Sequence, residues 1–149
     1  MGSRPAALAL AMTISIGLAG CGADSLSAQQ LRARAVQICS AAVLRTDAIV
    51  TPITPGQGAR YLRQGADALV PEVRALDRLR PPRDMAGRFR TATSADDHEL
   101  RALRSAVRGL RAGNDPVVAI KTLQQQLAPA EARADGAWAS LGVPSCTSR

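Results

Sequence analysis

The only cluster of potential metal ligands in this chain lies at positions 96–99. It contains Asp96, Asp97, Glu99 and His98, which is the only histidine. Asp96 and Glu99 are three residues apart, so that on a helix both carboxylates can face one way. A catalytic zinc site normally takes two or three nitrogen or sulfur ligands, which one histidine cannot supply. Asp96, His98 and Glu99 are therefore weak metal candidates. The favoured alternative is a capping box from Ser94 to Asp97 that interrupts a helix near position 93.

Motifs of the common enzyme classes are absent. A hydrolytic triad would rest on His98 alone, and no Gly-x-Ser-x-Gly nucleophile elbow accompanies it. The chain also lacks a phosphate-binding loop, a dinucleotide fingerprint and a Cys-x-x-Cys-His haem site. We therefore expect no catalytic residues and no cofactor, and we interpret the chain as a non-enzymatic protein.

The N-terminal 20 residues have the pattern of a targeting segment. Arg4 precedes an apolar run at 6–18, which matches a signal h-region and is shorter than the ~20 residues of a spanning helix. The run ends in Leu18-Ala19-Gly20-Cys21, which resembles a bacterial lipobox. This resemblance implies cleavage before Cys21, lipid (palmitate among its acyl chains) on the Cys21 thiol, and a location on the extracytoplasmic face of the cell membrane. An ordinary signal peptide and a marginal membrane anchor are the alternatives.

Composition indicates a bacterial protein and argues against nucleic-acid binding. Of the 19 basic residues all but Lys121 are arginine, the net charge is +7, and Ala, Gly and Pro are abundant. This bias is typical of a GC-rich genome such as that of an actinomycete. One Trp, one Tyr and one Phe are too few to form stacking platforms for single strands. The positive charge instead suits anionic lipid or cell-wall polymer.

Two cysteines remain once Cys21 carries lipid. In an oxidising compartment Cys39 and Cys146 are expected to form one disulfide. A pair of free thiols is the alternative.

Turn and capping signals divide the rest of the chain into four helices, without strand or hairpin patterns. The first begins with a capping box at Ser27 and Gln30 and ends at Pro52. The second begins with a box at Thr54 and Gln57 and continues to the prolines at 81 and 82. Its apolar positions keep the 4-3-4-3 spacing of a bundle seam, and they are Leu62, Ala66, Leu69, Val73 and Leu76.

The third helix is expected over about 84–112, and the fourth starts at Asp115 and Pro116 and ends at Gly142. Pro71 and Pro129 fall inside the second and fourth helices, where we expect curvature or a small polar pocket. Because the loops are short, we predict an all-α, up-down antiparallel four-helix bundle. The expected segments are a signal peptide at 1–20, a lipidated tether at 21–26 and a helical bundle domain at 27–149.

Arginines gather at the end of this bundle that would lie near the membrane. They are Arg78, Arg80, Arg83, Arg88 and Arg90, with Arg32 and Arg34 nearby. A six-residue tether reaches at most ~20 Å, so these side chains are candidates for contact with anionic head groups. A solvated surface is the alternative. Arg101, Arg104, Arg108 and Arg111 form a second stripe, for which a solvated face is favoured over an acidic partner.

Together these patterns predict a membrane-anchored envelope lipoprotein that acts as a binding or interaction module, with an envelope protein as an expected partner and no nucleic acid. The whole chain resembles small actinomycete helical lipoproteins of uncharacterised function, which combine a lipobox, a helical body and one late cysteine. The alternative is a small-ligand or metal carrier that uses a kinked mid-bundle polar site near Asp96, His98 and Glu99.

Overall fold

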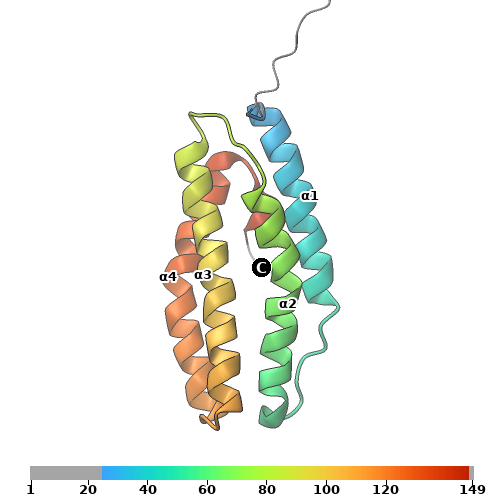
Figure 1. Cartoon of the computed structure of the whole chain (residues 1–149), viewed down its shortest axis with the longest axis vertical. Helices are drawn as coiled ribbons and strands as arrows, with labels where there is room; N and C mark the ends of the chain where they lie inside the picture. Colours follow the sequence, from blue (N-terminus) through green and yellow to red (C-terminus); the bar gives the residue numbers. More distant parts are fainter. Residues whose placement is uncertain (1–24, 148–149) are drawn as a thin grey trace, which may run out of the picture.

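The computed structural model describes residues 25–147, and within them every regular element is helical (Figure 1). Four long helices are joined by loops and by two short 3₁₀ segments, and the all-α prediction is confirmed. The elements are α1 (Ala28–Asp47), η1 (Pro55–Gln57), α2 (Gly58–Asp77), α3 (Ala86–Arg111), α4 (Pro116–Leu141) and η2 (Pro144–Cys146). The predicted signal peptide and the lipidated Cys21 lie outside the described residues.

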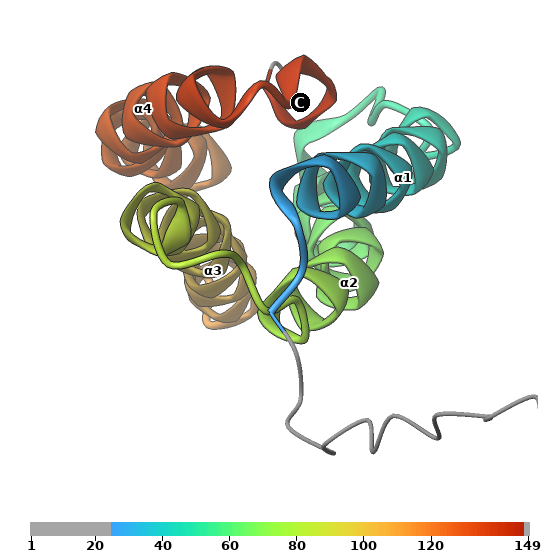
Figure 2. The same cartoon turned by 90° about the horizontal axis from the view of Figure 1, so that it is seen from above.

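The four helices pack in the order of the sequence. Helix α3 packs against α2 on one side and α4 on the other, and α1 packs against α2. Seen from above, η2 lies between the ends of α4 and α1 (Figure 2), and it contacts both of them. The fourth side of the bundle is thus closed near one end by η2 and not by a long α1–α4 seam.

The core has two parts along the bundle axis. The first lies around Trp138, which is fully buried and meets Phe89 edge-to-face with ring centroids 5.8 Å apart. Helix α1 contributes Leu31, Ala35 and Cys39 to this part. The second part is built from α2, α3 and α4 without α1. Its α2 residues include Leu62, Ala66, Leu69 and Val73, and these four with Leu76 are the buried residues of the predicted α2 stripe.

Two of the predicted helix starts are confirmed by side-chain hydrogen bonds. The backbone N–H of Gln30 donates to Ser27 Oγ at 3.2 Å, and the N–H of Ser27 donates to Gln30 Oε1 at 2.9 Å. At the start of α4, the N–H groups of Val117 and Val118 both donate to Asp115 Oδ1 at 2.9 Å. Local sequence therefore fixes where α1 and α4 begin, because each cap satisfies backbone donors that the helix itself leaves open.

The other two predicted capping boxes are wrong. Thr54 makes no side-chain cap, and Gln57 Oε1 instead accepts the N–H of Ile53 at 2.9 Å, so that η1 precedes α2. Helix α3 continues unbroken through Ser94, whose hydroxyl donates to the carbonyl of Thr91 at 3.0 Å. Ala92 and Ala95 on either side of this point are buried in the core. Tertiary packing therefore keeps α3 helical where the local sequence favours a new start.

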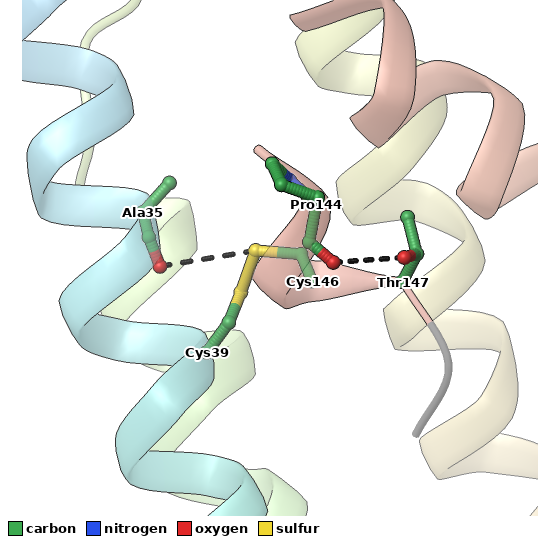
Figure 3. Close-up of a disulfide and its surroundings, with 5 residues drawn as sticks. All are labelled: Ala35, Cys39, Pro144, Cys146 and Thr147. Carbon is green, nitrogen blue, oxygen red and sulfur yellow. Dashed lines mark hydrogen bonds between the residues drawn. A yellow bond between two sulfur atoms is a disulfide. The ribbon is translucent and has the colours of Figure 1, made fainter. Parts of the chain in front are cut away.

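The disulfide joins α1 to η2 and confirms the predicted pairing of Cys39 with Cys146 (Figure 3). The two Cα atoms are 5.1 Å apart, and both residues are buried. Cys146 Sγ also lies 3.8 Å from the carbonyl oxygen of Ala35, which is a packing contact because a disulfide sulfur carries no proton. The bond attaches the C-terminal segment to α1 at the side of the bundle where α1 and α4 are apart.

Helix α4 ends at a glycine that the backbone requires. Gly142 has a φ of 73°, in the left-handed region that other residues adopt at a cost. A Cβ on Gly142 would lie 3.1 Å from Nε of Arg32, and that Nε donates to the carbonyl of Leu141 at 2.8 Å. The arginine from α1 thus satisfies a carbonyl at the C-terminus of α4.

Replacing Gly142 with alanine is expected to lower the free energy of unfolding by about 1–2 kcal/mol, the usual cost of left-handed backbone for an L-residue. Urea unfolding followed by circular dichroism measures this. The matched control is Gly136→Ala, because an added Cβ there meets nothing within 4 Å and mid-helix alanine is favoured by about 0.5–1 kcal/mol. If the two substitutions changed the free energy of unfolding equally, the claim that the backbone at position 142 requires glycine would be contradicted.

Candidate functional site

A small polar cavity lies between α3 and α4 and reaches the disulfide. Its volume is about 130 Å³. Four carboxylate residues line it, namely Asp96, Glu99, Glu131 and Asp135, and the rest of the wall is formed by Ala95, Ala130, Ala134 and Cys146. The cavity is therefore acidic on two helices and small enough to take only water, an ion or a small molecule.

The three candidate metal ligands do not meet in this cavity. Asp96 is buried with 4% of its surface exposed, and Glu99 is half-buried, but His98 is exposed and does not line the cavity. Consecutive residues on a helix point about 100° apart, so that His98 faces away from the side shared by Asp96 and Glu99. Among residues 25–147 no group of three or more His, Cys, Asp or Glu side chains is placed to hold a metal ion. Asp96 and Glu99 therefore share the cavity, whereas His98, the third weak metal candidate, lies outside it.

Asp97 pairs with a neighbouring arginine and is not part of a cap. Its carboxylate accepts from Arg101, one turn further along α3. Such an exposed pair on a helix contributes only about 0.3–0.5 kcal/mol. Arg101 belongs to the predicted arginine stripe on α3, and all four of its members are exposed.

Sequence analysis missed a second buried carboxylate, Glu72 on α2. Its exposed fraction is 0%, and the side chain is among the largest that are fully buried. Along α2 it lies next to Val73, the last residue of the second core part on this helix, and one turn before Leu76 of the first part. On α3, Asp96 lies between Ala95 of the first part and Leu100 of the second. The signal was present in the spacing, since Glu72 is three residues after Leu69 and four before Leu76. Two buried carboxylates, one on α2 and one on α3, thus lie near the boundary between the two core parts.

The five arginines of the basic end are all exposed, as a surface role requires. Arg78 and Arg80 follow α2, Arg83 lies in the loop, and Arg88 and Arg90 belong to the first turns of α3. The start of the described chain is attached to this loop, because the N–H of Leu26 donates to the carbonyl of Arg80 at 2.8 Å. Leu26 also packs against the first core part. The chain that comes from Cys21 thus enters the fold directly beside the basic end.

Arg88 of the basic end, and nearby Arg32, also have a structural role at the C-terminus of α4. Arg88 donates to the carbonyls of Ser140 and Asp84, both at 3.5 Å, and Arg32 donates to Leu141. Cations near a helix C-terminus are favoured by the helix dipole. Arg78, Arg80 and Arg83 have no such contact within the described residues, so they remain accessible to a partner.

Both prolines lie inside helices, as predicted, with Pro71 in α2 and Pro129 in α4. Because proline has no N–H, Pro71 leaves the carbonyl of Asp67 without its helical donor. At the next residue, Arg45 of α1 donates to the carbonyl of Ala68 at 3.1 Å. An arginine of α1 thus bonds the α2 backbone one residue after the carbonyl that Pro71 leaves open.

Of the helices in residues 25–147, none has the length and apolarity needed to cross a membrane. Comparison of the chain with protein-family models, with curated proteins and with solved structures found no match.

Proposed function

We propose that this protein is a lipid-anchored lipoprotein on the outer face of the cytoplasmic membrane and acts there as a non-enzymatic binding module. The observation that carries the proposal is the segment Leu18-Ala19-Gly20-Cys21 at the end of a short apolar run. The Cys39–Cys146 disulfide supports it, because disulfides persist in oxidising compartments outside the cytoplasm.

The proposal is tested by fractionating bacteria that process lipoproteins. The full chain is expected in the membrane fraction, and Cys21→Ser is expected in the soluble fraction or as an uncleaved precursor, because the thiol is the acylated atom. The control is Cys146→Ser, which removes a thiol at the other end of the chain. Membrane retention of mature Cys21→Ser would contradict lipid anchoring through this residue.

The bundle is, in the same proposal, up-down and antiparallel. The course of the colours in Figure 1 supports this topology, since the loops after α1 and α3 lie at the bottom and the loop after α2 lies at the top. The entry of the chain, the α2–α3 loop and the end of α4 would then share one end of the molecule. The hydrogen bond between Leu26 and Arg80 is consistent with that placement.

The basic end would contact anionic lipid head groups. Leu26 is the fifth residue after Cys21, and an extended chain spans at most ~3.6 Å per residue. The arginine loop, to which Leu26 is hydrogen-bonded, would therefore lie within ~20 Å of the lipid surface. One acyl signal combined with a basic patch anchors more firmly than either does alone.

The test uses the unlipidated mature chain, residues 21–149 with Cys21→Ser, and vesicles of phosphatidylglycerol. We expect its affinity for the vesicles to fall about a hundredfold when Arg78, Arg80 and Arg83 are changed to Gln. The reason is that each basic residue near an anionic surface contributes ~1 kcal/mol to binding. Flotation at low and high salt measures this binding. The matched control changes Arg104, Arg108 and Arg111 to Gln, which removes equal charge from exposed positions on α3. Equal losses in both variants, or binding that salt does not weaken, would contradict a specific basic end.

A second candidate is a small-ligand carrier, favoured by the acidic cavity between α3 and α4. The carboxylates of Asp96, Glu99, Glu131 and Asp135 would suit a small organic cation there and not a metal ion. Native mass spectrometry of the protein extracted from its own membranes tests this. An added mass that Asp96→Asn removes would support the carrier, and the unmodified mass of the lipidated chain would contradict it.

A further inference from the structure

The loop between α1 and α2 carries apolar side chains that the fold does not bury. Ile53 is 90% exposed and Val50 is 82% exposed. With Pro52 and Tyr61 they line a surface groove of about 330 Å³ between this loop and the start of α2, which we call the distal groove. Arg60 and the polar side chains of Gln57 and Gln64 complete its rim.

The first turn of α4 also carries exposed apolar side chains. The 3₁₀ segment η1, which follows the loop, contacts α4, and Val117 and Val118 at the start of α4 are 70% and 63% exposed. The loop after α1 and the start of α4 both lie toward the lower end of the molecule in Figure 1. Large apolar side chains gathered at one end of a monomer are typical of an interaction site.

In the proposed anchoring, with the bundle upright on the membrane, the distal groove lies too far from the lipid to be covered by it. The groove lies at the start of α2, and Arg80, to which the entering chain is bonded, follows its end. A helix of 20 residues extends about 30 Å at 1.5 Å per residue. With the tether anchored beside Arg80, the distal groove stands clear of the lipid by about the length of the bundle.

The charge at the groove distinguishes a foreign partner from a second copy. A two-fold dimer brings the same patch against itself, and this patch offers no acidic side chain to the Arg60 of either copy. None of the residues that line the groove is acidic, and Arg60 forms no ion pair within residues 25–147. A complementary surface would instead be apolar and carry a carboxylate beside Arg60.

We propose that the distal groove docks an apolar segment of another envelope protein, in which an acidic side chain pairs with Arg60. Ile53 and Val50 would supply the apolar contact and Tyr61 the amphipathic wall. Such a partner would be held about one bundle length above the membrane. This inference rests on the proposed lipid anchoring, because the anchor determines which end of the bundle faces away from the lipid.

Site-specific photo-crosslinking in intact cells tests the proposal. Benzoylphenylalanine replaces Ile53 in the full chain, expressed in the bacterium from which it comes, and the matched control carries it at Gln124, an exposed polar position on α4. We expect one discrete adduct with another protein at position 53 and none at position 124. The adduct is identified by mass spectrometry, and the partner is then purified.

Affinity for the purified partner decides the outcome. Ile53→Asp and Arg60→Glu are each expected to raise Kd by about tenfold or more, as for central interface residues, while Arg104→Glu leaves it unchanged. The inference is overturned if the substitutions at Ile53 and Arg60 leave the affinity unchanged. It is also overturned if position 53 gives no adduct, or gives an adduct with lipid or with a second copy of this chain. Membrane fractionation of the same cells separates the two claims, since loss of the adduct with retained anchoring refutes only the docking site.

Discussion

Replacing Cys39 and Cys146 with alanine is expected to lower the free energy of unfolding by about 4–5 kcal/mol. The bond joins residues 107 apart in sequence, and a loop of about 100 residues gives this value in the chain-entropy model. Domains of this size are stable by only about 5–15 kcal/mol. The double variant should therefore unfold at much lower urea concentration, which circular dichroism of the unlipidated mature chain measures.

The loss of stability in the variant without the disulfide should be greatest in α1, because that helix packs chiefly against α2 and the disulfide-linked η2. Hydrogen exchange is expected to show faster exchange along α1 than along α3 once the bond is absent. The Cys146→Ser variant alone serves as a control for the effect of leaving one free thiol. An unchanged urea midpoint, or uniform acceleration over all four helices, would contradict the role of η2 as the closure between α1 and α4.

Replacing Trp138 with alanine is expected to cost about 3–5 kcal/mol, the range for deleting a large buried aromatic side chain. Trp138 is fully buried in the first core part and packs edge-to-face on Phe89. The substitution leaves a cavity at the level where α4 approaches η2. Since the chain has one tryptophan, circular dichroism and not fluorescence must follow the unfolding.

Trp138→Phe is the matched control. It keeps a ring against Phe89 and removes an indole Nε1 that is buried without a hydrogen bond in the described structure. A buried unsatisfied donor costs about 1–3 kcal/mol, so that the loss of the larger ring is offset in part. We expect the phenylalanine variant to unfold much closer to the wild type than the alanine variant does. Equal destabilisation by both would indicate that packing at this position is loose.

Features set by neighbouring residues could be predicted from the sequence. The caps at Ser27 and Asp115 are made by side chains within three residues of the groups they bond, and the stripe on α2 follows from helical spacing alone. The disulfide could also be predicted, because Cys39 and Cys146 were the two cysteines left after Cys21. Such signals depend little on where distant helices lie.

Features that depend on packing between helices could not be predicted from the sequence. Ser94 has the residue type of a cap, yet α3 continues because Ala92 and Ala95 are buried against other helices. The predicted capping box from Ser94 to Asp97 would also place Asp96 in the first turn of a new helix, whereas Asp96 is buried inside α3. Glu72 occupied an inward position and was overlooked, because charged residues are rarely buried. The distal groove depends on the loop between α1 and α2, whose conformation the spacing of residues does not encode.

Cys21 is the residue on which the proposed function rests, since the proposed orientation of the basic end and of the distal groove follows from its lipid anchor. The most direct test is the intact mass of the protein extracted from membranes of a bacterium that processes lipoproteins. We predict a chain that begins at Cys21, carries the mass of a lipid anchor on that residue, and is two protons lighter for the Cys39–Cys146 disulfide. A chain that retains residues 1–20, or one cleaved elsewhere without lipid, would contradict the central claim.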